Sequence, residues 1–342
     1  MISLRYRKDD GFDVWQKRIC TFLLLQLAGL FFFMPFAFAA GAYNKSYVGE
    51  MGTYITSYED TMIQIARNHN IGFNELRAAN QGIDPWIPGA GVKVVLPTMH
   101  ILPKAAHEGI VINVPEQRFY YFFEQGAPPI THPIGVGREG LATPEGKTTI
   151  VRKAIGPIWR PTPRMREADP KLPAEIGPGP DNPMGTHAMY LGWPEYAMHG
   201  TNKPYGIGRR SSSGCIRLYP EDIVSMYEIV PVGTQVTVVN QPVKVGWVGN
   251  DLYMEAHPSL DQAADMEQSG VVTSYEFTDK DLARLMEEAG IYADLIDWPL
   301  VRKIIHLREG SPVIIARKPL EKKVESEEKA LPEDIQSDEG RS

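Results

Sequence analysis

The stretch MHGTNKPYGIGRRSSSGCIRL, residues 198–218, contains one histidine, three arginines and one cysteine. The chain has 342 residues and two cysteines, Cys20 and Cys215, and Cys20 lies in an apolar N-terminal segment. Without this segment, Cys215 is the only cysteine of the sequence. A lone cysteine is either an inert buried thiol or a reactive thiol that is kept unpaired. The cysteine count alone favours the inert alternative, so the residues around Cys215 decide between the two.

The neighbours of Cys215 favour a nucleophile. A free thiol has a pKa of about 8.5, so nucleophilic use requires a base or positive surroundings. His199 can act as the base because imidazole exchanges protons near neutral pH. Arg209, Arg210 and Arg217 can supply positive charge. The glycine and serines beside the cysteine allow a tight turn whose backbone N–H groups can hold an oxyanion.

The same stretch disfavours a metal or redox site. His199 and Cys215 stand sixteen residues apart without the further ligands of a zinc site, and no C-x-x-C motif is present. We therefore expect a Cys–His acyl transferase or hydrolase with neither a metal nor a cofactor.

The pattern H-G-T, then a gap, then S-x-G-C-I-R-L resembles the active-site signature of the L,D-transpeptidases, which have a YkuD-type catalytic domain. The segments PIGVGREGLATPEGKTTI and DNPMGTHAMYLG also look like family segments. The resemblance covers about residues 50–255, in an order similar to that of periplasmic L,D-transpeptidases of Gram-negative bacteria. Ser213 departs from the pattern, since many members have histidine there, and a role that requires an imidazole at this position is in doubt. The matching residues are His199, Gly200, Thr201, Ser212, Gly214, Cys215, Ile216, Arg217 and Leu218.

The resemblance implies a role for each residue. Cys215 is the nucleophile, His199 is the general base and then the acid, and Gly200 orients His199 through its carbonyl group. Arg217 either binds a carboxylate of the substrate or braces the loop. The oxyanion-hole candidates are the backbone N–H groups of Ser213, Gly214 and Cys215. The further candidates for substrate binding are Arg210, Thr201, Ser212, Tyr190 and Met184.

By the same resemblance, the acyl donor is a peptidoglycan tetrapeptide stem. The Cys215 thiolate attacks the carbonyl of the L,D-linked diaminopimelate, D-alanine leaves and a thioester remains. Three acceptors stay open: an amine of another stem, which gives a 3–3 cross-link, a lysine of a lipoprotein, which becomes attached to the wall, or water, which gives an L,D-carboxypeptidase. The formal net charge of −7 argues against nucleic acid as a partner.

We expect a mainly β fold, with a YkuD-type β-sandwich at residues 109–240. The 28 prolines and 31 glycines favour a loop-rich chain, and apolar runs such as IVINV, RFYYFF, KTTIVRK and GTQVTVVN predict strands. PEDIVSMYEIV, just after Cys215, predicts a helix. Residues 157–185 are too rich in proline for a regular element, and a loop of this length is usually functional.

Residues 53–97 predict a small β-α-α-β unit, followed by a linker at 98–108. TYIT predicts a strand, and EDTMIQIA and LRAANQG lie in two predicted helices. This unit resembles a LysM domain, which binds N-acetylglucosamine chains, and the alternative is a LysM-like fold without carbohydrate binding. The alternative function is wall binding through this unit without catalysis. The intact pair of His199 and Cys215 argues against this alternative.

The two ends of the chain differ from its middle. Residues 1–39 predict an export signal, because Lys17 and Arg18 precede a long apolar run and AFA provides a cleavage site. This implies the periplasm, with an uncleaved inner-membrane anchor as the alternative. Residues 40–52 form a short polar connector.

Residues 241–317 predict a partly helical C-terminal extension. TDKD at 278–281 predicts the start of one helix, and a second is expected near 298–307. Residues 318–342 are charged and poor in apolar residues, so we expect a disordered tail.

Overall fold

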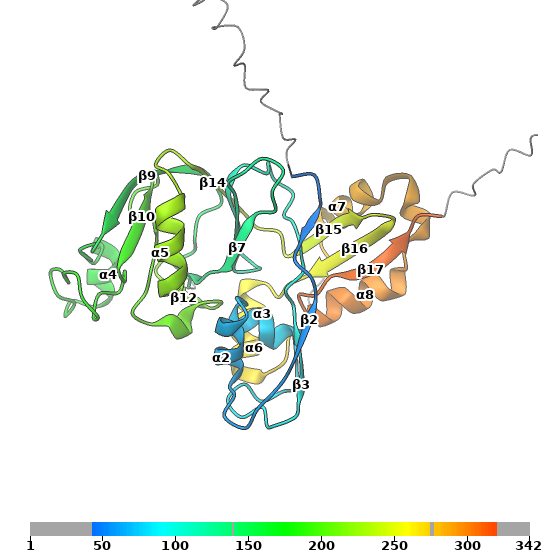
Figure 1. Cartoon of the computed structure of the whole chain (residues 1–342), viewed down its shortest axis with the longest axis horizontal. Coiled ribbons are helices and arrows are strands. Elements are labelled where there is room, and N and C mark those ends of the chain that lie inside the picture. The colour runs from blue at the N-terminus through cyan, green and yellow to red at the C-terminus, as the bar shows by residue number, and fades with distance from the viewer. Residues whose placement is uncertain (1–42, 139, 274–276, 320–342) are drawn as a thin grey trace, which may run out of the picture. The chain divides into compact units, whose positions relative to one another are not determined.

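The structure is a computed structural model that describes residues 43–138, 140–273 and 277–319 (Figure 1). The expected export signal at 1–39 and nearly all of the charged tail lie outside these residues. The described residues belong to one unit that begins at Tyr43, and the small unit, the catalytic part and the extension are all within it.

Eight strands between residues 109 and 239 form one sheet. Most neighbours are antiparallel, but β11 and β13 run parallel, as do β14 and β5. A separate parallel pair joins β8 (Val136–Gly137) to β12 (Arg210–Ser212). The expected mainly β fold class is therefore confirmed. In order across the sheet, the strands are β13 (Ile216–Arg217), β11 (Ala197–His199), β10 (His187–Leu191), β9 (Gly146–Ile155), β14 (Gln235–Val239), β5 (Gly109–Asn113), β6 (Arg118–Phe122) and β7 (Ile130–Pro133).

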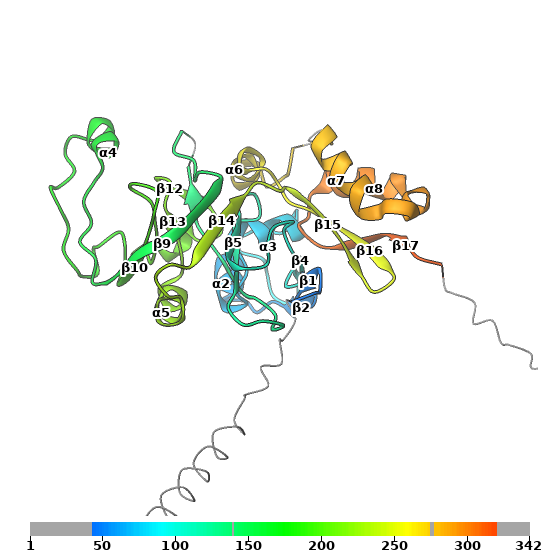
Figure 2. The same ribbon diagram turned by 90° about the horizontal axis from the view of Figure 1, so that it is seen from above.

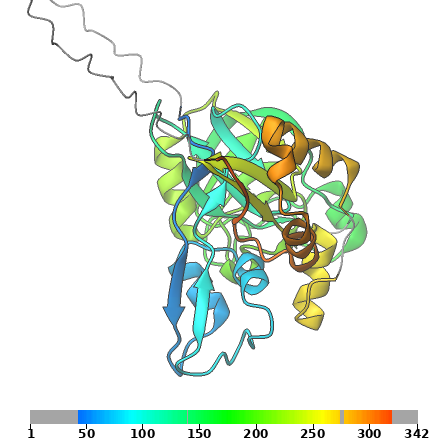
Figure 3. The same cartoon turned by 90° about the vertical axis from the view of Figure 1, so that its right-hand side faces the viewer.

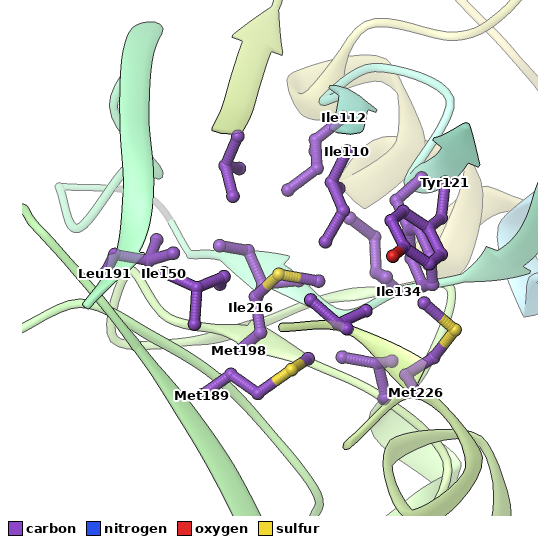
Figure 4. Close-up of a cluster of buried hydrophobic side chains, with 14 of the residues drawn as sticks. Ile110, Ile112, Tyr121, Ile134, Ile150, Met189, Leu191, Met198, Ile216 and Met226 are labelled. Carbon is purple, nitrogen blue, oxygen red and sulfur yellow. The ribbon is translucent and has the colours of Figure 1, made fainter. Parts of the chain in front are cut away.

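One apolar core lies against this sheet. Ile216 from β13 and Tyr121 from β6 belong to the same buried cluster, although five other strands lie between β13 and β6 in the sheet order. Figure 4 shows side chains from these strands converging with Met226 of the helix that follows Cys215. The sheet is therefore curled around its core, and burial of these side chains provides the main stabilisation of the catalytic part.

The helix predicted after Cys215 is confirmed as α5 (Pro220–Ile229), with Ile223 and Met226 fully buried. The proline-rich segment 157–185 differs from its expectation in one respect. It contains a short helix, α4 (Pro163–Ala168), because Thr162 caps it and Pro163 occupies the first turn, where no N–H donor is required. The loop that carries α4 projects beyond the sheet (Figure 2).

The small N-terminal unit has the predicted β-α-α-β order. Its two strands pair antiparallel, and Figure 3 shows them side by side. The second helix is buried on almost every side, including Asn74 and Glu75, because it packs against other parts of the chain as well as its own core. The predicted linker also contains a strand, in which His100 is 2% exposed. These elements are β1 (Tyr47–Val48), β2 (Gly52–Ile55), α2 (Met62–Asn68), α3 (Phe73–Ala79), β3 (Lys93–Leu96) and β4 (His100–Ile101).

The C-terminal extension contains the two expected helices and a three-stranded sheet that the sequence analysis did not predict. Thr278 caps the first expected helix by accepting a hydrogen bond from the Asp281 backbone, and the second begins at Trp298. An additional helix, α6, precedes both. The elements are β15 (Val243–Val248), β16 (Asp251–Ala256), α6 (Leu260–Ser269), α7 (Asp279–Ala289), α8 (Trp298–Leu307) and β17 (Val313–Arg317).

Within the described ranges, none of the helices is long and apolar enough to cross a membrane.

A buried cluster of charged side chains joins the three parts. Lys244 of β15 places its ammonium 2.8 Å from Glu116 and 2.9 Å from Glu255, and all three side chains are about 1% exposed or less. Arg118 of β6 pairs with Glu75 of α3 at 2.7 Å. Burial would raise the pKa of Glu255, but the Lys244 ammonium and the neighbouring histidines hold it well below its ordinary value. We call this set the ionic junction, with His100 and His257 completing it.

We predict that Lys244→Ala lowers the free energy of unfolding by about 3–5 kcal/mol, since it leaves two buried carboxylates without their cation. Chemical denaturation measures the loss. The control is Lys104→Ala, which removes an exposed lysine from its pair with Glu287 and should cost less than about 1 kcal/mol. Equal losses for the two variants would contradict the role given to the junction.

Candidate functional site

The fold brings His199 and Cys215 to neighbouring strands. In the parallel pair of β11 and β13, Met198 faces Ile216 and His199 faces Arg217. Cys215 lies directly before β13, and its side chain lines the same cavity of about 650 Å³ as His199. The histidine and cysteine of the sequence motif are therefore in one site, at the edge strand of the curled sheet.

The imidazole of His199 is fixed by its backbone neighbour. Nδ1 lies 2.6 Å from the carbonyl oxygen of Gly200, so Nδ1 carries the proton and Nε2 is left as the basic nitrogen. Burial and the nearby charge of Arg217 lower the pKa of His199 to about 4. The ring is therefore neutral at pH 7 and able to accept a proton.

The thiol of Cys215 is also neutral at rest. Its Sγ lies 3.5 Å from the carbonyl oxygen of Glu195, which accepts the thiol hydrogen. Burial raises the pKa of Cys215, and the charge of Arg217 opposes this only in part. A thiol in this state requires a base to become a nucleophile, and His199 lies in the same cavity.

The turn before Cys215 is tightly packed. Gly214 has φ +110°, and a Cβ there would lie 2.8 Å from the ring of Tyr196. Ser212 Oγ accepts from the Gly214 N–H at 3.1 Å and donates to the Cys215 carbonyl at 2.5 Å. Of the three predicted oxyanion donors, the Gly214 N–H is thus already engaged. The N–H groups of Ser213 and Cys215 remain as candidates.

Two segments form the walls of the cavity. The loop 157–185 with α4 supplies one wall, and the turn 192–196 between β10 and β11 supplies another. Of the predicted substrate-binding residues, Tyr190, Met184, Ser212 and Arg217 line the cavity. The lining includes four arginines and one glutamate, which suits an anionic ligand: Arg152, Arg160, Arg164, Arg217 and Glu195.

The arginines of the motif have different surroundings. Arg217 donates to the Ser211 carbonyl at 3.2 Å, and its Nε has no hydrogen-bond partner among the described residues. Arg210 instead pairs with Asp261 of α6, so its charge is neutralised outside the cavity. Thr201 also lies away from the cavity lining, and its Oγ1 accepts from the Lys203 N–H at 2.9 Å.

Sequence reasoning missed three residues that shape the site. Thr143 Oγ1 donates to the Gly214 carbonyl at 2.8 Å, and the ring of Tyr196 packs against the same glycine. Arg164 of α4 reaches the Ser213 carbonyl at 3.5 Å. Thr143 stands in the family-like segment PIGVGREGLATPEGKTTI, which was a usable signal. Tyr196 and Arg164 carry no motif.

The residues that could hold a metal lie elsewhere. Within 43–138, 140–273 and 277–319, one group of possible ligands has its donor atoms within 4.8 Å of one another, namely His100, Glu116 and Glu255. Lys244 already bridges both carboxylates, so these residues fit an ion-pair cluster better than a metal centre.

Comparison with known proteins agrees with this geometry. The family YkuD, described as an L,D-transpeptidase catalytic domain, matches residues 107–238. The chain is 37% identical to probable L,D-transpeptidase ErfK/SrfK of Salmonella typhimurium over 73% of this chain and 81% of that protein. It is 35% identical to probable L,D-transpeptidase YcfS of Escherichia coli over 79% of this chain and 85% of that protein.

The chain belongs to the L,D-transpeptidase family.

Another relative, probable L,D-transpeptidase YbiS of Escherichia coli, is 44% identical, and the match spans 57% of this chain and 65% of that protein. The L,D-transpeptidase match at 107–238 covers both walls of the cavity and both His199 and Cys215. It leaves the small N-terminal unit and the C-terminal extension outside.

We predict that acyl transfer with His199 as its base keeps its kcat/KM far into acid, and that kcat/KM falls only as the pH drops through about 4. The imidazolium form of His199 cannot accept the thiol proton, so activity requires a pH above its pKa. Initial rates with a soluble acyl donor give the profile, and tryptophan fluorescence at each pH detects unfolding. An acid limb centred near the ordinary histidine pKa would contradict the buried, neutral imidazole.

Proposed function

We propose that the chain is a peptidoglycan L,D-transpeptidase, a cysteine acyltransferase that acts on tetrapeptide stems. The observation that carries this proposal is the combination of a Gly200-anchored His199 and an unpaired Cys215 in one arginine-lined cavity. The names of the relatives support the same reaction class.

In the proposed reaction, His199 Nε2 takes the proton of the Cys215 thiol as Sγ attacks the diaminopimelate carbonyl. The backbone N–H groups of Ser213 and Cys215 stabilise the oxyanion. His199 then gives its proton to the amine of the leaving D-alanine, and a thioester remains. An incoming amine attacks this thioester, loses a proton to His199 and forms the new amide as the thiol is regenerated.

The charge of the cavity supports a stem as the donor. A tetrapeptide stem carries carboxylates on its diaminopimelate and on its terminal D-alanine. Arg217 lies at the catalytic turn with one nitrogen unpartnered in the described structure, and Arg164 approaches from α4. We propose that Arg217 both braces the loop through Ser211 and binds a carboxylate, since its bond to Ser211 leaves the fork of its guanidinium only partly used.

We propose an amine as the acceptor, either a diaminopimelate of another stem or a lysine of a lipoprotein. Hydrolysis to a tripeptide, the activity of an L,D-carboxypeptidase, is the alternative. We also infer that residues 1–39 direct export to the periplasm, since the substrate lies there. Product analysis by mass spectrometry separates a cross-linked dimer, a protein–peptide conjugate and a free tripeptide.

We predict that Cys215→Ala abolishes D-alanine release and that His199→Ala comes close to the same loss, since each removes one half of the nucleophile–base pair. Release of D-alanine from tetrapeptide muropeptides is the measurement. His187→Ala is the matched control, because this histidine is bonded to Thr186 and lies outside the cavity lining. Near-normal turnover by either site variant would refute the mechanism.

We also propose that the LysM-like unit binds glycan strands. Two aromatic side chains of its loops are exposed, Tyr58 at 81% and Trp86 at 57%. Exposed aromatic rings offer flat apolar faces with a polar edge, which suits a sugar ring. The unit cannot be deleted cleanly, because Glu75 and Asn74 anchor α3 to the rest of the chain.

We predict that Trp86→Ala weakens binding to isolated sacculi by about fivefold, the equivalent of about 1 kcal/mol. Co-sedimentation with sacculi measures the affinity, and turnover of soluble stems should stay unchanged. Phe123→Ala, which removes a half-exposed ring from the catalytic part, serves as the control. Equal sacculus binding by wild type and Trp86→Ala would exclude Trp86 from a glycan site.

A further inference from the structure

The segment that connects His199 to Cys215 is held from outside by two other parts of the chain. It returns through a 3₁₀ turn at Pro204–Gly206 and the short strand β12 before it reaches the cysteine. The strands at its two ends are only three and two residues long. The segment also pairs with β8 through β12 and makes backbone hydrogen bonds to residues 134–138. Its remaining contacts are with two other parts of the chain.

The first contact is with α3 of the small N-terminal unit. Gly208 has φ +68°, and a Cβ there would lie 2.2 Å from the Phe73 nitrogen, so only glycine allows this approach. The Gly208 carbonyl accepts from the Asn74 N–H at 3.1 Å. The middle of the segment is thus pressed directly against the start of α3.

The second contact is with α6 of the C-terminal extension, through Glu267. Glu267 Oε2 accepts from Arg209 Nε at 2.8 Å, and Glu267 Oε1 accepts from Asn74 Nδ2 at 3.0 Å. The Arg209 guanidinium also lies over the Phe73 ring, 5.1 Å from its centroid. Glu267 is 17% exposed, so the pair is shielded from water more than an ordinary surface ion pair.

The third contact is also with α6. Arg210 pairs with Asp261, and its Nε donates to the Gly137 carbonyl at 3.3 Å. Met266 of α6 packs with Ala78 of α3, so the two helices support each other. Arg209 and Arg210, which the sequence suggested as positive surroundings for the thiol, are in fact bound by two carboxylates of one helix.

We call residues 200–214, which connect His199 to Cys215, the catalytic loop. We propose that α6 acts as a brace, that is, that it holds the catalytic loop in place, and that Glu267 is a positioning residue for Cys215. This inference rests on the proposed function and assigns a task to the C-terminal extension. Nucleophilic attack requires the reacting atoms in a defined geometry, and a misplacement of about 1 Å caused by a distant substitution can cost about a hundredfold in rate. Glu267 acts through Arg209 on the segment that ends at Cys215.

The position of α6 predicts which kinetic constant changes. Most of the cavity wall, residues 157–185 and 192–196, belongs to other segments than the one that α6 contacts, although that segment contributes Ser212 and Ser213 to the lining. Loss of the brace should therefore leave substrate binding nearly intact and lower the rate of acylation. A purely structural role for Glu267 would change thermal stability without this separation of kcat from KM.

The experiment uses the full chain and a soluble tetrapeptide stem. We expect Glu267→Ala to lower kcat about ten- to hundredfold while KM stays within about twofold. Glu267→Gln, which keeps an acceptor for Asn74 but removes the charge, should fall between this variant and wild type. Hydrogen exchange of residues 203–214 should rise in Glu267→Ala.

The matched control is Asp251→Ala, which breaks the Arg317–Asp251 pair in the same extension, far along the chain from the catalytic loop. It should shift the melting temperature without a change in kcat. A Glu267→Ala variant that keeps the kcat of Asp251→Ala would overturn the proposal. If Glu267→Ala does not fold, two other variants test the same brace. Arg209→Ala removes the partner of Glu267 on the catalytic loop, and Asp261→Ala removes the exposed partner of Arg210 on α6.

Failure of this inference is distinguishable from failure of the proposed function. The wild-type chain must release D-alanine for the proposed function to stand, whatever the variants do. The brace is tested only by the ratio of variant to wild-type kcat.

Discussion

The ion pairs of Lys244 with Glu116 and Glu255 are the constraint on which the arrangement of the described residues depends. A buried charge is tolerated only beside its counter-charges, and here the charges come from different parts. Lys244 and Glu255 belong to the three-stranded sheet, whereas Glu116 lies beside β6. Glu75 of α3 joins through Arg118. The small unit, the catalytic part and the extension must therefore assemble together.

This assembly explains why boundaries drawn from composition do not separate independent modules. The 98–108 segment has the composition of a linker, yet His100 is buried within 3.5 Å of Glu75 and Glu116. Once α3 is fixed by the junction, it presents Asn74 to the catalytic loop and to Glu267. The same pairing that holds the parts together thus also orders the approach to the active-site turn.

Sequence reasoning succeeded where the signal is local. Pro220 and an apolar face predict the helix at 220–229, and the H-G-T and S-x-G-C segments predict the family. The structure places His199 and Cys215 of these segments in one cavity, and their catalytic roles stay a prediction. It failed where the cause is a contact between distant segments. Neither the ionic junction nor the packing of Tyr196 on Gly214 has a local pattern. Arg209 and Arg210 were expected to act on the thiol, but their partners lie more than fifty residues away on α6.

The surroundings of Cys215 and His199 determine which of the two proton transfers in the proposed reaction is favourable. Burial raises the pKa of Cys215 and lowers that of His199 to about 4, so transfer of the thiol proton to the imidazole is unfavourable before the thiol attacks. A thiolate therefore forms only as attack proceeds, when backbone N–H groups stabilise the new oxyanion. The imidazolium that results is a strong acid for a histidine, because burial and the charge of Arg217 both disfavour it. It consequently delivers its proton readily to the leaving amine, and the feature that opposes the first proton transfer favours the second.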